Sequence, residues 1–99
     1  MGKAVLTAIE QIIEFHDVDY ERWWSSLKRT DMKVMIGLTF SDDSPMSKEF
    51  SHQFKLGASS TVYSSLKRLL ENGYVAKIKD HYESDDPFFK RWIYMRRKA

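Results

Sequence analysis

Cysteine is absent from this chain of 99 residues, and glycine and proline are scarce, with four and two copies. Without cysteine the chain has no disulfide, no thiol nucleophile and no cysteine-ligated zinc. No apolar run approaches the roughly 18–20 residues of a membrane-spanning helix. The N-terminal segment lacks the apolar region and cleavage site of a signal peptide. We therefore expect a cytoplasmic protein with no membrane partner.

Aromatic and aliphatic residues are plentiful, at 14% aromatic and 42% hydrophobic overall. This composition predicts one packed domain with a single modest core. The net charge of +2 is small, but its distribution is uneven. Residues 1–50 hold six Lys/Arg against nine Asp/Glu, whereas residues 51–99 hold ten against five. A basic second half is typical of a surface that faces a polyanion.

The first 40 residues show the spacing of three helices. Residues 3–16 carry an apolar stripe at helical spacing, formed by Ala4, Leu6, Ile9, Ile12, Ile13 and Phe15. We assign 1–19 as an N-terminal helix and lead-in, and 20–99 as the remainder of one compact domain. A short aromatic helix is expected over 20–28 with Asp19 as its N-cap, and a third begins at the N-cap Thr30, with Asp31 near its positive end. Trp23 and Trp24 are expected to anchor the core or an interface, with a stacking platform for a ligand as the alternative.

Residues 46–87 give a helix, a turn, a second helix and a hairpin. Ser47 is expected to cap a helix over 48–55, and Gly57 permits the positive φ of the turn. Ser59 or Ser60 is expected to cap the second helix, which ends at Asn72-Gly73 and buries Val62, Leu66, Leu69 and Leu70. Two strands are expected next, over 74–78 and 81–83, with Val75 and Ile78 of the first strand facing inward. A last helix is expected over 88–98, with Asp86 as its N-cap and Pro87 at its first position. The prediction is a mostly α fold with a small β-hairpin, a winged helix-turn-helix with additional N- and C-terminal helices.

The outward face of the helix that ends at Asn72 is the candidate binding surface. Hydroxyls and free amides at a helix N-terminus suit phosphate contacts, and the next turn would reach base edges in a major groove. Lysines on the hairpin suit phosphate contacts beside it. The predicted DNA-binding residues are Ser59, Ser60, Thr61, Tyr63, Ser64, Lys67, Arg68, Lys77 and Lys79.

Catalytic signals are lacking. His16, His52 and His81 do not have metal-site spacing with acidic residues, and His52 is expected to face solvent. Asp86 stands before Pro87, where capping is its expected role. No nucleotide-binding or nucleophile motif occurs. We expect no enzyme activity, no cofactor and no metal in this chain.

From about Tyr20 to Arg97 the chain resembles the C-terminal winged-helix domain of prokaryotic P-loop (AAA-type) ATPases. The resemblance depends on the order of TDMKVMIGLTF, PMSKEF, LGASSTVYSSLKRLLENGYV and DPFFKRWI. It implies a non-catalytic regulatory domain that contacts DNA or a partner and passes that contact to an ATPase core. The Walker motifs of such a core are absent here. The short turn at Lys79-Asp80 departs from a long phosphate-gripping wing, which argues against insertion into the minor groove.

Three functions remain open at this stage. The first is contact with double-stranded DNA through the helix that ends at Asn72. The second is a protein–protein or intramolecular docking module without DNA affinity, in which Trp23, Trp24 and Trp92 matter more than Lys67. The third is homodimerisation through the first helix, which would give a concentration-dependent mass.

Overall fold

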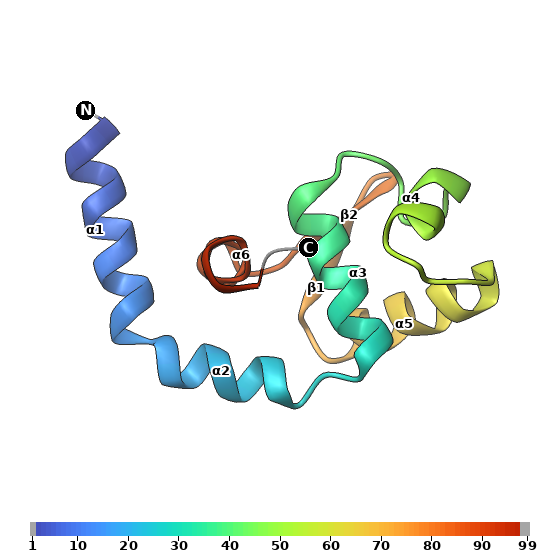
Figure 1. The fold of residues 1–99 in the computed structure, drawn as a ribbon, viewed down its shortest axis with the longest axis horizontal. Helices are drawn as coiled ribbons and strands as arrows, with labels where there is room; N and C mark the ends of the chain where they lie inside the picture. Colours follow the sequence, from blue (N-terminus) through green and yellow to red (C-terminus); the bar gives the residue numbers. More distant parts are fainter. Residues whose placement is uncertain (1, 98–99) are drawn as a thin grey trace.

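The computed structural model describes residues 2–97, which form six helices and a hairpin of two strands (Figure 1). The side chains of Ala4 and Leu6, and Lys98 in the predicted last helix, lie outside the described residues. The elements are α1 (Gly2–Phe15), α2 (Asp17–Ser25), α3 (Arg29–Phe40), α4 (Lys48–Gln53), α5 (Ser59–Glu71), β1 (Val75–Ile78), β2 (His81–Ser84) and α6 (Pro87–Arg96). The predicted fold class is confirmed.

Two of the predicted helix starts are confirmed in detail. The Ser47 hydroxyl accepts a hydrogen bond from the N–H of Phe50 at 3.2 Å and so caps α4. One carboxylate oxygen of Asp86 accepts from the N–H groups of Phe88 and Phe89 at 2.8 and 3.3 Å and caps α6, with Pro87 at its first position. Both caps are local signals, since donor and acceptor lie within three residues.

The other predicted N-caps are wrong. α2 begins at Asp17, directly after a break at His16, so Asp19 lies inside its first turn. α3 begins at Arg29 after the extended residue Lys28, which places Thr30 within the helix. α5 begins at Ser59 because Gly57, at φ 81°, turns the chain into an extended Ala58 that takes the N-cap position.

The core is centred on α3, which lies between α5 on one side and α6 on the other (Figure 1). Val34 and Met35 of α3 are fully buried. A cluster of aromatic rings from α2 and α6 continues this core: Tyr20, Trp24, Phe89 and Trp92, with ring centroids about 6 Å apart. Trp24 and Trp92 are therefore core anchors, as expected of large apolar side chains.

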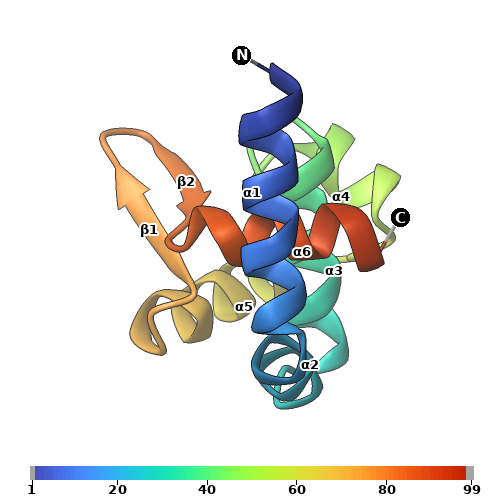
Figure 2. The same cartoon turned by 90° about the vertical axis from the view of Figure 1, so that its left-hand side faces the viewer.

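The hairpin pairs β1 and β2 antiparallel, from Val75 opposite Ser84 to Ile78 opposite His81. Lys79 adopts φ 55° in the two-residue turn. Val75 is buried as predicted, but Ile78 is 46% exposed because it lies at the tip of a hairpin that extends beyond the body (Figure 2). The prediction that Ile78 faces inward is wrong.

α1 crosses α6 and is attached to the body mainly at its C-terminal half (Figure 2). Ile13 is fully buried and Ile9 packs against the core. α2 is fastened to α6 by polar contacts: Trp92 Nε1 donates to Asp17 Oδ1 at 2.7 Å, and Arg97 Nη2 donates to both Glu21 oxygens at 2.6 Å. These contacts hold the lead-in against the last helix.

Candidate nucleic-acid interface

α5 presents a polar face that is open to solvent. Val62, Leu66 and Leu69 are buried, as the predicted stripe requires, and Leu70 is half-buried. The opposite side exposes Ser59, Ser60, Thr61, Tyr63, Ser64, Lys67 and Glu71. A helix of 13 residues is about 20 Å long, enough to lie in a major groove that is about 12 Å wide. Hydroxyls and one cation therefore share an accessible face.

Arg68 is turned away from this face toward the core. Its Nη2 and Nε donate to the two carboxylate oxygens of Asp31 at 2.7 and 3.2 Å. The buried hydroxyl of Ser65 donates to the same carboxylate at 2.5 Å. The hydrogen bond from Arg68 to Asp31, together with the attraction of the opposite charge, raises the pKa of the Arg68 guanidinium. Arg68 thus ties α5 to α3, a role that its helical position did not reveal.

The N-terminus of α5 lacks a side-chain cap. Ala58 occupies the N-cap position, and its carbonyl accepts from the N–H groups of Thr61 and Val62 at 3.1 and 3.3 Å. The first turn of α5 therefore combines the positive end of the helix dipole with the hydroxyls of Ser59 and Ser60. This end of the helix favours a negatively charged group.

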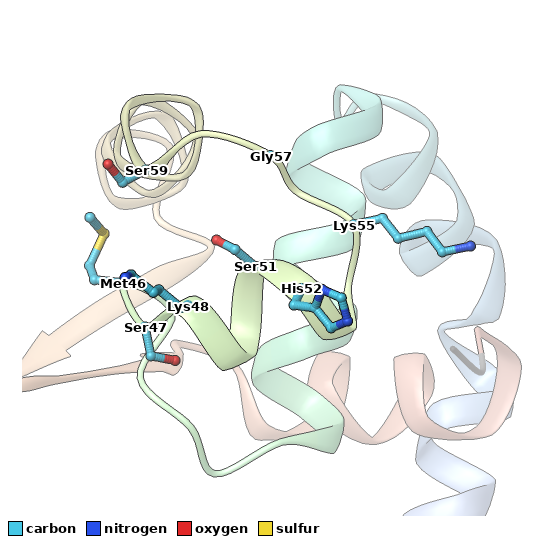
Figure 3. Close-up of a pocket in the computed structure, with 8 residues that line it drawn as sticks. All are labelled: Met46, Ser47, Lys48, Ser51, His52, Lys55, Gly57 and Ser59. Atoms are coloured by element: carbon cyan, nitrogen blue, oxygen red, sulfur yellow. The ribbon is translucent and has the colours of Figure 1, made fainter.

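A hollow of about 730 Å³ lies between α4 and this end of α5 (Figure 3). It is lined by Met46, Ser47, Lys48, Ser51, His52, Lys55, Gly57 and Ser59. His52 is exposed, as predicted, and Lys48 is exposed on the first turn of α4. The Lys55 side chain extends away from Ser59 in Figure 3, so Lys48 is the cation we associate with this hollow. Sequence reasoning assigned no role to Lys48 or Ser51, although the basic residue after Ser47 was a usable signal.

The predicted hairpin lysines occupy a separate element. Lys77 lies on β1 with its Nζ 5.5 Å from the centroid of the Tyr82 ring, and Lys79 is exposed in the turn. Asp80 follows in the same turn, and His81 contacts Glu83 at 3.1 Å. The hairpin is therefore a mixed-charge surface with two accessible cations. The predicted site residues thus belong to two surfaces, with Arg68 on neither.

Other kinds of site are not prominent. Within residues 2–97, no group of three or more metal-ligating side chains lies together. No helix in the described part of the chain is long and apolar enough to cross a membrane.

The docking surface that the sequence suggested is smaller than expected, because Trp24 and Trp92 are 7% and 0% exposed. Of the three tryptophans that were predicted to form it, only Trp23, at 38%, reaches the surface. Trp24 and Trp92 therefore offer almost no surface to a partner.

Helices α3, α4 and α5 followed by the β1–β2 hairpin define the class of protein, a winged helix. A family model described as "Probable winged helix domain" matches residues 18–95, and the chain belongs to this family. No curated protein and no solved structure matches the chain. The match covers nearly all of α2 to α6 and leaves the whole of α1 outside. It establishes the winged helix and carries no link to P-loop ATPases.

Proposed function

We propose that this chain is a non-catalytic DNA-binding winged helix that places the outward face of α5 in the major groove of a duplex. The observation that carries the proposal is the uncapped N-terminus of α5, with Ser59, Ser60 and Lys48 around it. Backbone amides and a cation at such an end match a phosphate, because the helix dipole and the lysine act on the same negative charge.

The proposed DNA contacts are of two kinds, those that can read bases and those that bind phosphates. Thr61, Ser64 and Lys67, one turn apart on the exposed side of α5, would meet base edges or the groove wall. Lys48, Lys77 and Lys79 would contact phosphates, which adds affinity but little sequence preference. Arg68 is left out of the contact set, because its guanidinium is bound to Asp31.

The test is fluorescence anisotropy of a labelled random-sequence duplex at about 50 and 200 mM salt, a range over which phosphate contacts weaken sharply. Replacing both Lys67 and Lys77 by alanine should lower the affinity and flatten the salt dependence by about one counterion per lysine. The matched control removes two exposed cations on α2 and α6, in Arg22→Ala with Lys90→Ala, and so keeps the net charge equal. Equal losses in both double variants, or no binding at low salt, would overturn the proposal.

The regulatory role implied by the resemblance to P-loop ATPases is a further part of this proposal. It is supported by the quoted sequence features alone. Its test is to add this chain to a P-loop ATPase encoded in the same genomic neighbourhood and to measure ATP hydrolysis with and without duplex DNA. A rate that depends on this chain would support it, and an unchanged rate would argue for a free-standing winged helix.

A further inference from the structure

α1 carries two apolar seams on one helix. The first, which includes Ile9 and Ile13, packs against the body. The second is formed by Val5, Ala8, Ile12 and Phe15, all of which are exposed. The exposed fractions are 52% for Val5, 42% for Ile12 and 83% for Phe15. The monomer thus leaves a continuous apolar seam exposed to water, which is unfavourable in free energy because apolar surface is more stable when it is buried.

The spacing of the open seam is that of a helix–helix contact. Val5, Ala8, Ile12 and Phe15 are separated by three, four and three residues, which is the a/d pattern of a heptad repeat. The carboxylates of Glu10 and Glu14 lie on the other side of the helix by this periodicity. The positions that flank the seam are Ala4, Ile9, Gln11 and His16. None of these carries a fixed charge, so two identical seams can meet without like-charge repulsion.

The seam is also complementary to itself when one copy is reversed. In an antiparallel pair whose twofold axis crosses the seam at the level of residue 10, Val5 of one copy lies opposite Phe15 of the other, and Ala8 lies opposite Ile12. Each layer then joins a small side chain to a large one, which fills the contact evenly. A parallel pair would instead place Phe15 against Phe15 and Ala8 against Ala8, leaving one crowded layer and one void. The antiparallel arrangement also opposes the two helix dipoles.

We propose that two copies of this chain pair through α1 in an antiparallel, twofold-symmetric contact along the seam of Val5, Ala8, Ile12 and Phe15. The seam is accessible in the monomer, because α1 stands at the edge of the molecule (Figure 1) and packs on the body through Ile9 and Ile13. A 14-residue helix is about 21 Å long, so this contact is smaller than the standard stable interface. The dimer is therefore expected at micromolar rather than nanomolar concentration. The inference does not depend on DNA binding.

Sedimentation equilibrium from about 1 µM to about 1 mM tests the pairing. The wild-type mass should rise from 11.7 kDa toward twice that value. Ile12→Glu with Phe15→Glu should stay monomeric, and since both side chains are exposed the variant should keep its helical circular dichroism. Glu10→Lys, on the polar side of α1, is the control that should still dimerise. A wild-type mass of 11.7 kDa at every concentration, or a dimer that survives both glutamates, overturns the proposal.

The orientation has a separate test, which the absence of natural cysteine makes clean. Ala8→Cys and Ile12→Cys chains are oxidised alone and as an equal mixture, and the linked species are identified by mass. The antiparallel register predicts that the mixed disulfide forms in preference to either self-linked pair, because Ala8 faces Ile12 across the contact. Preferential self-linking of Ala8→Cys would overturn that register.

Discussion

Arg68 on α5 donates two hydrogen bonds to the carboxylate of Asp31 on α3, from Nη2 to Oδ1 at 2.7 Å and from Nε to Oδ2 at 3.2 Å. The two side chains differ in exposure, since that of Arg68 is 34% exposed and that of Asp31 only 6%. The buried hydroxyl of Ser65 donates a third hydrogen bond to the same carboxylate. This contact fixes the roll of α5 about its axis, and with it the direction in which Ser60, Ser64 and Lys67 face.

Removing the arginine should cost more stability than neutralising the aspartate. Arg68→Ala leaves a buried carboxylate with only the Ser65 hydroxyl, and we expect a loss of about 2–3 kcal/mol, reduced from the value for a fully buried pair by the partial exposure of Arg68. Asp31→Asn removes the buried charge, keeps Oδ1 as the acceptor for Ser65 Oγ and Arg68 Nη2, and loses only the acceptor of Arg68 Nε, so its loss should be about 1 kcal/mol. Urea unfolding followed by circular dichroism measures both. Equal losses would show that the buried charge is not the source of the cost.

Gly37 is the second position where packing decides the outcome. It lies inside α3, where replacing glycine by alanine normally stabilises a helix by up to about 1 kcal/mol. A Cβ at this position would overlap ring atoms of Phe50, a side chain that is fully buried. We therefore expect Gly37→Ala to destabilise the protein by about 1–3 kcal/mol, the cost of overpacking a core.

The control for this prediction relieves the overlap. Phe50→Leu is expected to be destabilising by itself. In the double variant with Gly37→Ala, the loss of stability should be smaller than the sum of the two single losses. The thermal unfolding midpoints of the four chains give the coupling. Strict additivity would mean that the Gly37–Phe50 contact does not cause the loss.

The pattern of correct and incorrect predictions follows the distance over which each signal acts. Ser47 and Asp86 cap the helices predicted for them, and Gly57 and Gly73 take positive φ, because each depends on a few neighbouring residues. Asp31 and Arg68 are 37 residues apart in the sequence, and no local pattern predicts that they pair. Helical periodicity placed Arg68 on the outward face of α5, but a long side chain near the edge of that face can turn to a buried charge.

The candidate interface was partly predictable for the same reason. The exposed residues of α5 follow from its buried stripe, and the structure agrees with that division for Tyr63, Ser64 and Lys67. The hollow beside Lys48 needs the angle between α4 and α5, which depends on the whole core. Likewise, the sequence showed one apolar stripe in 3–16, whereas the structure buries Ile13 and leaves Ile12 and Phe15 exposed.

Burial and negative neighbours predict a pH dependence through Tyr20. Desolvation, followed by the carboxylates of Asp86 and Asp19, raises the pKa of the Tyr20 hydroxyl above its ordinary value of about 10. Because the folded pKa is the higher one, the contribution of Tyr20 to stability is fully present below about pH 10 and is lost as the pH rises through the folded value. Urea midpoints of the wild type and Tyr20→Phe should keep a constant difference up to that pH and then shift in favour of Tyr20→Phe. A difference that stays constant at higher pH would show that ionisation of Tyr20 does not affect folding.

A Lys48 variant tests the hollow between α4 and α5 separately from the rest of the proposed DNA surface. It stands on the first turn of α4 and lines the hollow beside Ser59, whereas Lys67 lies on α5 itself. Under the proposed function Lys48→Ala should weaken binding to every duplex by a similar factor of about 3–10 and lower the salt slope by about 1, because a phosphate contact carries no sequence information.

Ser64→Ala should behave differently. Its hydroxyl lies on the exposed side of α5, where it would meet base edges, so the affinity should fall for some sequences and stay unchanged for others. Anisotropy titrations of both variants against a panel of duplexes, with Lys90→Ala as the matched cation control, measure the difference. If Lys48→Ala and Lys90→Ala lose the same affinity, the hollow has no special role. A uniform loss in Ser64→Ala would instead mean that Ser64 contacts the backbone and does not read bases, since phosphate contacts carry no sequence information directly.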